Sequence, residues 1–298
     1  MMKRLRDLGE DALIDRILKG FPGGRSLMVG PGDDCAVVDP GRGPLRLLKT
    51  DAIVEGVHFL AETPAEKVGW KAIARVLSDF AAMGGKPDHL LVTVAVDPDK
   101  PVAWMDGLYR GIRKCLAKHG GILAGGETSR LPAGAMISVA GEGSVARKHL
   151  VLRSGGKPGD RVVVTGCLGG SLAGKHLSFT PRLAEAAWLV EHLRPSAMMD
   201  LSDGLAKDLP RLAAASNCGF EIGEVPANRG CTRQQALGDG EDYELLLTVS
   251  EKRWQATAEA WKQAFPKLPL TAIGRLTEQG KGIHLTGGWD HFSATAQP

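Results

Sequence analysis

The sequence predicts a mixed α+β chain of two domains, and three observations support this prediction. The chain has 298 residues, which is long for a single compact core. Predicted strands and helices alternate in both halves without a clean G-x-G-x-x-G or P-loop sequence, so the chain is not an obvious Rossmann protein. The stretch 153–160 (RSGGKPGD) is polar and rich in turn residues. We therefore predict a boundary there, between domains 1–150 and 151–298.

Apolar spacing predicts the elements of the first half. The clearest helix covers 64–83, where Pro64 suits the first turn, apolar residues recur at helical spacing, and two glycines follow. The segment 44–51 is predicted as a strand that ends in Asp51, and 121–125 as a short strand that enters a glycine turn. The remaining predicted elements of this half are helices at 10–19 and 101–119 and strands at 89–97 and 135–146.

The second half repeats this alternation of strands and helices. We predict strands at 161–166, 197–201 and 243–249, and closing strands from Leu270 onward. The predicted helices of this half lie at 170–177, 181–193, 204–216 and 251–265.

Composition and charge exclude several classes of protein. Hydrophobic residues make up 43% and charged residues 24% of the chain, which is typical of a soluble globular protein and not of a disordered one. Basic residues number 37 and acidic residues 34, and this near balance gives no reason to expect nucleic acid or an anionic membrane as a partner.

Cysteine usage and hydropathy bear on location. The five cysteines are scattered and form no C-x-x-C, so a disulfide framework or a structural zinc site is not expected, and a reducing compartment is favoured. Charges interrupt the apolar residues of the N-terminal segment, and no stretch approaches the roughly 18 apolar residues of a membrane span. We therefore predict a cytoplasmic protein.

The unusual feature of the sequence is the placement of its acidic residues. Many lie at the edge of an apolar segment with glycine close by, where the backbone can approach a ligand. Carboxylates that converge on one cleft repel one another unless cations neutralise them. Hard oxygen ligands suit Mg²⁺, whose coordination substrate phosphates complete, and the chemistry expected of such a site is phosphoryl transfer. The acidic residues concerned are Asp33, Asp34, Asp51, Asp79, Glu127, Asp200, Asp203, Glu241 and Asp242.

A structural interpretation of each acid remains open at this stage. Asp beside Gly is ordinary turn chemistry, and Asp203-Gly204 could simply open the helix predicted at 204–216. Taken alone, each acid is more often structural than functional. Several such sites in one chain favour a metal site, but spacing alone does not show that they meet.

Eight segments carry a resemblance to a known family. From about residue 8 to residue 292, the chain resembles the thiamine-monophosphate kinase family, and the segments occur in that family's order. This family shares a superfamily of ATP-binding proteins with aminoimidazole ribonucleotide synthetase, selenophosphate synthetase and a hydrogenase maturation factor. The segments are GDDCAV, TDAIVEGVHF, GWKAIARVLSDFAAMGG, GGETSR, RSGGKPGD, TGCLGGSLAGKHL, DLSDGLAKDL and GEDYELLLTV.

The resemblance implies a fold and a reaction. It implies an N-terminal α+β domain that binds ATP and Mg²⁺ and pairs across a homodimer in an inter-subunit β-barrel, followed by a C-terminal α+β domain. ATP and thiamine monophosphate would bind with several Mg²⁺ ions, and the γ-phosphate would pass directly to the substrate phosphate. No dedicated catalytic base is expected, because the acceptor is already an ionised phosphate oxygen.

The resemblance also implies roles for residues at matching positions. The implied metal ligands are Asp34, Thr50, Asp51, Asp79, Glu127, Asp200 and Asp203. The implied nucleotide contacts are Gly126, Glu127, Arg153 and Ser202. His58 and Glu241 would contact the thiamine phosphate, and Trp289 would stack on its aromatic part.

Two positions depart from the family pattern. Glu127 lies in GGETS where the family has Asp in GGDTT, so the charge is kept but the side chain reaches further. Lys49 precedes the Thr-Asp pair where the family has a small residue, often Ser. This lysine could replace one cation electrostatically, or it could point away. The stretches between Pro181 and Met199 and before Gly240 are also compact for the family.

Two alternative functions remain open from the sequence. One is another ATP-dependent member of the superfamily that acts on a different small substrate. The selenophosphate branch carries a reactive Cys or selenocysteine in a Gly-rich N-terminal segment, and the hydrogenase-maturation branch ends in cysteine; neither feature occurs here. The other is a nucleotide-binding homologue with weakened catalysis, in which Glu127 and Lys49 have altered the metal site. Retention of the five aspartates at the implied metal positions argues against it.

Overall fold

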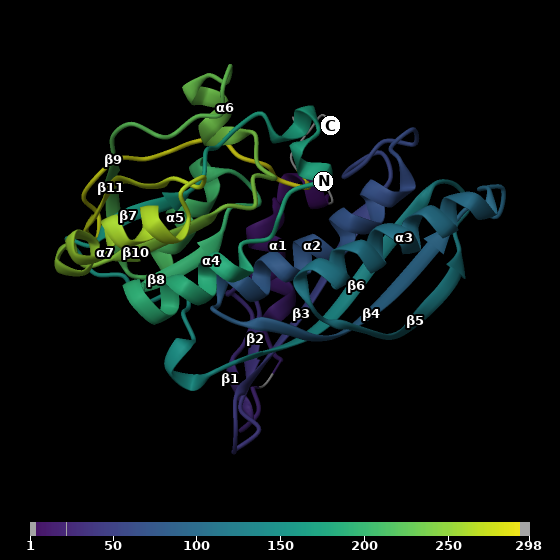
Figure 1. Cartoon of the computed structure of the whole chain (residues 1–298), viewed down its shortest axis with the longest axis horizontal. Helices are drawn as coiled ribbons and strands as arrows, with labels where there is room; N and C mark the ends of the chain where they lie inside the picture. Colours follow the sequence, from purple (N-terminus) through teal and green to yellow (C-terminus); the bar gives the residue numbers. More distant parts are fainter. Residues whose placement is uncertain (1–3, 22, 293–298) are drawn as a thin grey trace.

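The computed structural model describes residues 4–21 and 23–292, which form two sheets with the helix α2 (Ala65–Ala82) lying between them (Figure 1). The first sheet has the order β1-β2-β3-β6-β4-β5. Its strands are β1 (Leu27–Val29), β2 (Ala36–Val38), β3 (Leu45–Val54), β4 (Lys86–Val96), β5 (Ile122–Arg130) and β6 (Ala135–Val145).

Pairing in the first sheet is antiparallel except between β4 and β5, which are parallel. The connection between these two is α3 (Val102–His119), because parallel neighbours need a crossover that a tight turn cannot provide. Helices α2 and α3 pack on one face of this sheet. The helices approach closely at two glycines, where a Cβ on Gly69 would lie 2.0 Å from Leu108 O and one on Gly111 1.9 Å from Glu66 O.

The second sheet is antiparallel throughout, with the order β8-β10-β7-β11-β9. Helix α5 (Leu205–Ala215) covers one face. The other face packs against α4 (Leu183–Trp188), the π-helical turn Leu189–Leu193, α7 (Glu251–Ala264) and the C-terminal end of α2. The strands are β7 (Arg161–Thr165), β8 (Ala197–Asp200), β9 (Cys218–Ile222), β10 (Leu245–Val249) and β11 (Leu270–Glu278).

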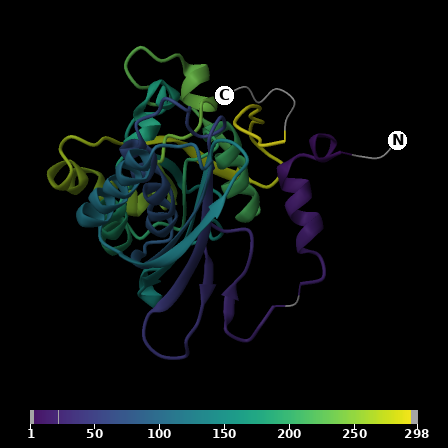
Figure 2. The same cartoon turned by 90° about the vertical axis from the view of Figure 1, so that its right-hand side faces the viewer.

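The remaining elements are short or peripheral. Helix α1 (Glu10–Leu18) lies at the side of the molecule (Figure 2) and has no buried residue. Short turns of helix occur at Leu5–Asp7, Arg147–His149, Ser171–Ala173, Lys175–Leu177 and, as α6, Arg233–Gly238. In the part of the chain that the structure describes, no helix is both long and apolar enough to cross a membrane.

The α+β fold is confirmed, and most predicted elements are found within two or three residues of their observed bounds. Four expectations were wrong. The closing strands expected from Leu270 onward are a single strand, β11, in the part of the chain that the structure describes. Strand β3 continues to Val54, so Asp51 lies within it instead of at its end. Strand β5 runs through the two glycines to Arg130, because pairing with β4 holds them extended instead of in a turn. The predicted helix 170–177 forms two separate 3-10 turns divided at Gly174, whose φ of 126° is unsuited to a helix.

Candidate active site

Helix α2 carries a row of charged side chains toward the interior. Lys71, Arg75 and Asp79 are spaced four residues apart, which places them on one face of the helix. Apolar residues of the same helix anchor it against both sheets. The charged row is therefore held in the space between the sheets, where each charge needs a partner.

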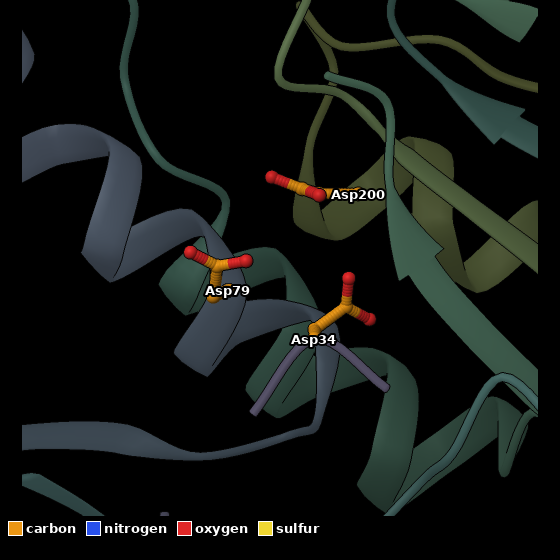
Figure 3. A group of neighbouring side chains, drawn as sticks. All are labelled: Asp34, Asp79 and Asp200. Carbon is orange, nitrogen blue, oxygen red and sulfur yellow. The ribbon is translucent and has the colours of Figure 1, made fainter. Parts of the chain in front are cut away.

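Three carboxylates meet at the C-terminal part of this row (Figure 3). Asp79 of α2, Asp34 from the loop before β2 and Asp200 at the end of β8 are buried, and each offers an oxygen within 4.8 Å of the others. Burial and the neighbouring carboxylates raise the pKa of Asp79 well above its usual value, although the charge of Lys49 opposes this shift. Burial and Asp34 raise the pKa of Asp200 to about 6. This arrangement is unfavourable without a cation.

The carboxylate cluster fits a small hard cation. Its donors are all oxygens, and oxygens are the ligands that Mg²⁺ prefers. The Oδ2 atom of Asp34 is buried and has no hydrogen-bond partner among the described residues. An orphaned buried acceptor is costly, and a bound cation would satisfy it.

Positively charged side chains contact the carboxylates of this cluster. Arg153 donates to Asp34 Oδ1 at 2.6 Å, and the Nζ atom of Lys49 lies 2.7 Å from Asp79 Oδ1. Burial opposes the charge of Lys49, but the carboxylates of Asp79 and Asp51 outweigh it and raise the pKa of this lysine. Of the two orientations that the sequence left open for Lys49, the structure therefore shows the inward one.

Asp51 lies beside the cluster and is paired. Arg75 Nε is 2.8 Å from Asp51 Oδ2, and Arg75 also donates to Asp51 Oδ1 at 3.1 Å. Asp33, next to Asp34, accepts the backbone N–H groups of Asp34 and Arg153, and its burial raises its pKa to about 6. The acidic group thus extends beyond the three converging carboxylates.

A cavity of about 520 Å³ lies near the cluster and is lined by residues that were expected to contact the substrate. Arg75 lines it and links it to Asp51, and Ser202 follows Asp200 by two residues. The cavity brings together His58, Ser202, Asp203, Glu241 and Trp289. Side chains that the sequence reasoning did not single out also line it, among them His176, Tyr243 and His291.

Glu241 is fixed at the cavity wall by a buried network. The Nζ atom of Lys71, itself fully buried, lies 2.6 Å from Glu241 Oε2 and 2.7 Å from His176 Nδ1, and donates to His58 O. Burial alone would raise the pKa of Glu241, but the contact with His176 and the charge of Lys71 lower it to about 2. Burial lowers the pKa of Lys71 to about 8. The carboxylate of Glu241 is therefore ionised in the folded protein at neutral pH.

Asp203 and Trp289 lie together on the far side of the cavity. Asp203 Oδ2 is 2.6 Å from Arg211 Nη1 and 3.1 Å from Lys207 Nζ. The backbone N–H of Trp289 donates to Asp203 O at 2.9 Å, and its ring meets His291 edge-on at 5.8 Å. Asp203 is thus held by two cations and is not one of the three converging carboxylates.

His58 is held in its neutral form. The backbone N–H of Val54 donates to Nδ1 at 3.1 Å, which requires that nitrogen to be unprotonated. Burial and the charge of Arg75 lower the pKa of His58 to about 4. The imidazole faces the cavity without a positive charge at neutral pH.

This shift predicts a loss of stability in acid. Because the pKa of His58 rises from about 4 when folded to 6.5 when unfolded, the unfolded chain takes up the proton first as the pH falls between these values. We expect His58 to lower the free energy of unfolding by about 1–2 kcal/mol from pH 7 to pH 4.5, after allowance for partial solvent exposure. Urea titrations should show a flatter pH dependence for His58→Gln. The exposed control His284→Gln should match the unaltered protein, and identical curves for all three would contradict the assignment.

Thr50, Gly126 and Glu127 lie away from the cluster. Side chains alternate along β3, so Thr50 points to the opposite face from Lys49 and Asp51 and lines a hollow on the outer face of the first sheet. Glu127 is exposed on the edge strand β5, opposite Thr93 of β4. A Cβ on Gly126 would lie 1.9 Å from Val92 O, so close strand pairing already requires a glycine there.

The sequence reasoning missed Lys71, Arg75 and His176. A usable signal existed for the first two, because charged residues at four-residue spacing interrupt the apolar stripe of 64–83 and lie in register with Asp79. For His176 the signal was absent, since its contact with Glu241 joins residues from different parts of the chain.

Comparison with known proteins agrees with this fold. The model for AIR synthase related protein, N-terminal domain, matches residues 32–145, and the model for the C-terminal domain matches 157–285. Thiamine-monophosphate kinase of Aquifex aeolicus is 34% identical over 97% of this chain and 100% of its own length. The enzyme of the same name from Escherichia coli K12 is 32% identical over 96% and 98%. A solved structure of AaThiL complexed with AMPPCP and TMP has a TM-score of 0.84 and 32% identity, covering 98% of this chain and 99% of that one.

This chain, with its two sheets and the buried carboxylates between them, is thus an AIR synthase-related protein, because it matches the models of both domains. Within that class, the chain belongs to the thiamine-monophosphate kinase family, as the full-length relatives show.

Proposed function

We propose that this chain transfers the γ-phosphate of ATP to the phosphate of thiamine monophosphate, which yields thiamine diphosphate and ADP. The observation that carries the proposal is the buried cluster of Asp34, Asp79 and Asp200 beside a cavity that contains His58, Glu241 and Trp289. The relatives' names support the reaction, and the structure of AaThiL complexed with AMPPCP and TMP supports the two substrates.

The chemistry requires charge neutralisation more than proton transfer. Mg²⁺ held by Asp34, Asp79 and Asp200 would neutralise charge on the transferring phosphoryl group. Arg153 offers a fork of donors to phosphate beside that cluster, and Arg75 presents its guanidinium at the cavity wall between the cluster and the acceptor. The acceptor phosphate oxygen is already ionised, so no side chain has to act as a base.

The acceptor side offers matching chemistry for a thiamine group. Glu241 carries a negative charge that complements the cationic thiazolium ring, and the Trp289 indole provides an aromatic surface for stacking. Neutral His58, whose Nδ1 atom accepts from the backbone of Val54, can donate a hydrogen bond from its Nε2–H without adding charge. In this proposal Ser202 contacts the nucleotide, and Asp51 and Asp203 are further metal ligands that would leave their arginine and lysine partners on binding.

The test is a direct assay. The purified protein is incubated with ATP, Mg²⁺ and thiamine monophosphate, and thiamine diphosphate is measured by chromatography. We expect stoichiometric formation of thiamine diphosphate and ADP. Absence of product from a protein that still binds ATP would reject the kinase and support a nucleotide-binding homologue with weakened catalysis.

We also propose a homodimer formed through the uncovered face of the first sheet. Apolar side chains are exposed there, with Leu48, Leu91 and Ile122 at 45%, 49% and 63%. Within one chain, Glu127 and Gly126 lie on β5, three strand spacings or about 14 Å from β3. Their proposed contacts with nucleotide and metal therefore require a site shared across the interface, where Thr50 also lies.

A single charge on this face should abolish the dimer. Leu91→Asp would bury a carboxylate in an apolar interface, which costs several kcal/mol. We expect sedimentation equilibrium to give about twice the chain mass of 31.6 kDa for the unaltered protein and the single-chain mass for the variant. Val102→Asp alters an equally apolar, exposed residue at the start of α3 and should remain dimeric. A dimeric Leu91→Asp protein would place the interface elsewhere.

The two halves have distinct tasks in this proposal. Residues 1–150 supply the dimer interface and most of the ATP and Mg²⁺ ligands, and residues 151–298 supply most of the acceptor cavity. We place the enzyme in the cytoplasm, where the proposed substrate ATP is available.

A further inference from the structure

The acidic residues in and around the carboxylate cluster differ in which neighbouring group neutralises them. Arg153 pairs with Asp34, Arg75 with Asp51, and Lys49 with Asp79. Asp200 instead accepts a hydrogen bond at 2.6 Å from Ser78 Oγ, a neutral group. Each of the first three carboxylates therefore has its own protein cation.

The balance of charges leaves room for few added cations. With Asp33 included, five carboxylates face three protein cations, so the group carries two net negative charges when every acid is ionised. A single divalent cation would balance that charge. A second one would have to overcome the repulsion of the three fixed cations.

Lys49 is the cation closest to the converging carboxylates. Its Nζ atom lies 2.7 Å from Asp79, which itself belongs to the group of three. The side chain is largely buried and extends from β3, whose pairing with both β2 and β6 fixes its direction. The ammonium group therefore occupies space beside Asp79 that a second metal ion would otherwise share.

We propose that Lys49 serves as a fixed cation in place of one divalent ion, so that the cluster of Asp34, Asp79 and Asp200 binds a single divalent cation per chain before nucleotide arrives. This inference deepens the proposed kinase function and rests on it for the role of the metal. Lys49 is thereby a positioning residue, which neutralises Asp79 and leaves Asp200 and the unpaired Oδ2 atom of Asp34 as ligands.

The alternative is an ordinary structural ion pair, and the two predict opposite signs. If Lys49 replaces a metal, its removal frees Asp79 and lowers the positive charge, so divalent cations bind more tightly or in greater number. If Lys49 only supports the local structure, its removal disorders the cluster, so divalent cations bind more weakly.

The experiment measures Mn²⁺ binding to the full chain without nucleotide, by the loss of the free-ion electron paramagnetic resonance signal. We expect one Mn²⁺ per unaltered chain. For Lys49→Ser we expect either a second Mn²⁺ or a dissociation constant lowered by about tenfold, as removal of a nearby positive charge implies. Lys49→Arg keeps the charge and should retain one ion with the original affinity.

A matched control separates this effect from the loss of any largely buried lysine. Lys100 pairs with Glu55 at 3.0 Å, and its exposure resembles that of Lys49, but it lies outside the cluster. Lys100→Ser should leave Mn²⁺ binding unchanged. Lys49→Gln provides a second neutral variant if Lys49→Ser does not fold. Weaker or unchanged Mn²⁺ binding in the folded neutral variant, or two ions on the unaltered chain, would overturn the proposal. Binding is measured without turnover, so a failed kinase assay would leave this result independent.

Discussion

Replacing Asp200 with Asn is expected to reduce the rate of thiamine diphosphate formation by about a thousandfold, which corresponds to about 4 kcal/mol of transition-state stabilisation. Asp200 contributes an oxygen to the group of three carboxylates, and among the described residues no lysine or arginine forms an ion pair with it. Asparagine keeps the shape and one acceptor, but it removes the negative charge that a divalent ion requires.

The same change should stabilise the metal-free protein. Burial and Asp34 raise the pKa of Asp200 to about 6, so at pH 7 its ionised form is less favourable in the folded state than in the unfolded one. We expect Asp200→Asn to raise the melting temperature without metal and to remove the added stabilisation by Mg²⁺. A purely structural aspartate would show the opposite result.

A matched control tests the specificity of this effect. Asp160 is also buried and accepts a hydrogen bond at 2.6 Å from a serine hydroxyl, that of Ser196, but it lies away from the cluster. Asp160→Asn should change stability and leave the turnover number within about threefold, as expected of a residue without a transition-state contact. Turnover by Asp200→Asn at a similar level would remove Asp200 from the metal-binding residues.

The second large effect concerns Lys71, whose replacement by Met should lower the free energy of unfolding by about 3–5 kcal/mol. The side chain is fully buried, and its ammonium group contacts Glu241, His176 and the carbonyl of His58. Methionine fills a similar volume but leaves the Glu241 carboxylate buried without its main cation. The loss should be measured by urea unfolding at pH 7.

A double variant and a surface control complete this test. Adding Glu241→Gln removes the stranded charge, so the double variant should recover part of the stability that Lys71→Met loses. Lys114 forms an exposed ion pair with Glu66, and Lys114→Met should change stability by less than about 0.5 kcal/mol. A Lys71→Met protein as stable as the Lys114→Met protein would show that the buried network is dispensable.

The longer helices could be predicted from the sequence because their signals are local. The helix expected at 64–83 is observed at Ala65–Ala82, since apolar spacing and the following glycines define it within its own segment. The length of strand β5 was underestimated because its extent depends on a non-local contact. Two consecutive glycines indicate a turn locally, and only pairing with β4 makes them extended.

The site residues also divide into those whose placement follows from local sequence and those whose placement depends on tertiary contacts. Strand alternation alone could have shown that Thr50 and Asp51 point to opposite faces of β3. No local pattern could show that Asp203 is held by Lys207 and Arg211 instead of meeting the three converging carboxylates. The metal, nucleotide and acceptor roles of the individual residues remain predictions that the variants above would test.

The sequence by itself determined the family, the main helices and the identity of the acids, because motif order and apolar periodicity are properties of the linear sequence. Only the tertiary structure decided that Asp34, Asp79 and Asp200 converge and that Lys49 turns inward to meet Asp79. Those contacts join residues far apart in the sequence, and their geometry depends on how α2 packs between the two sheets. Electrostatic interaction falls with distance and rises with burial, so the charge balance of the site is a property of that packing.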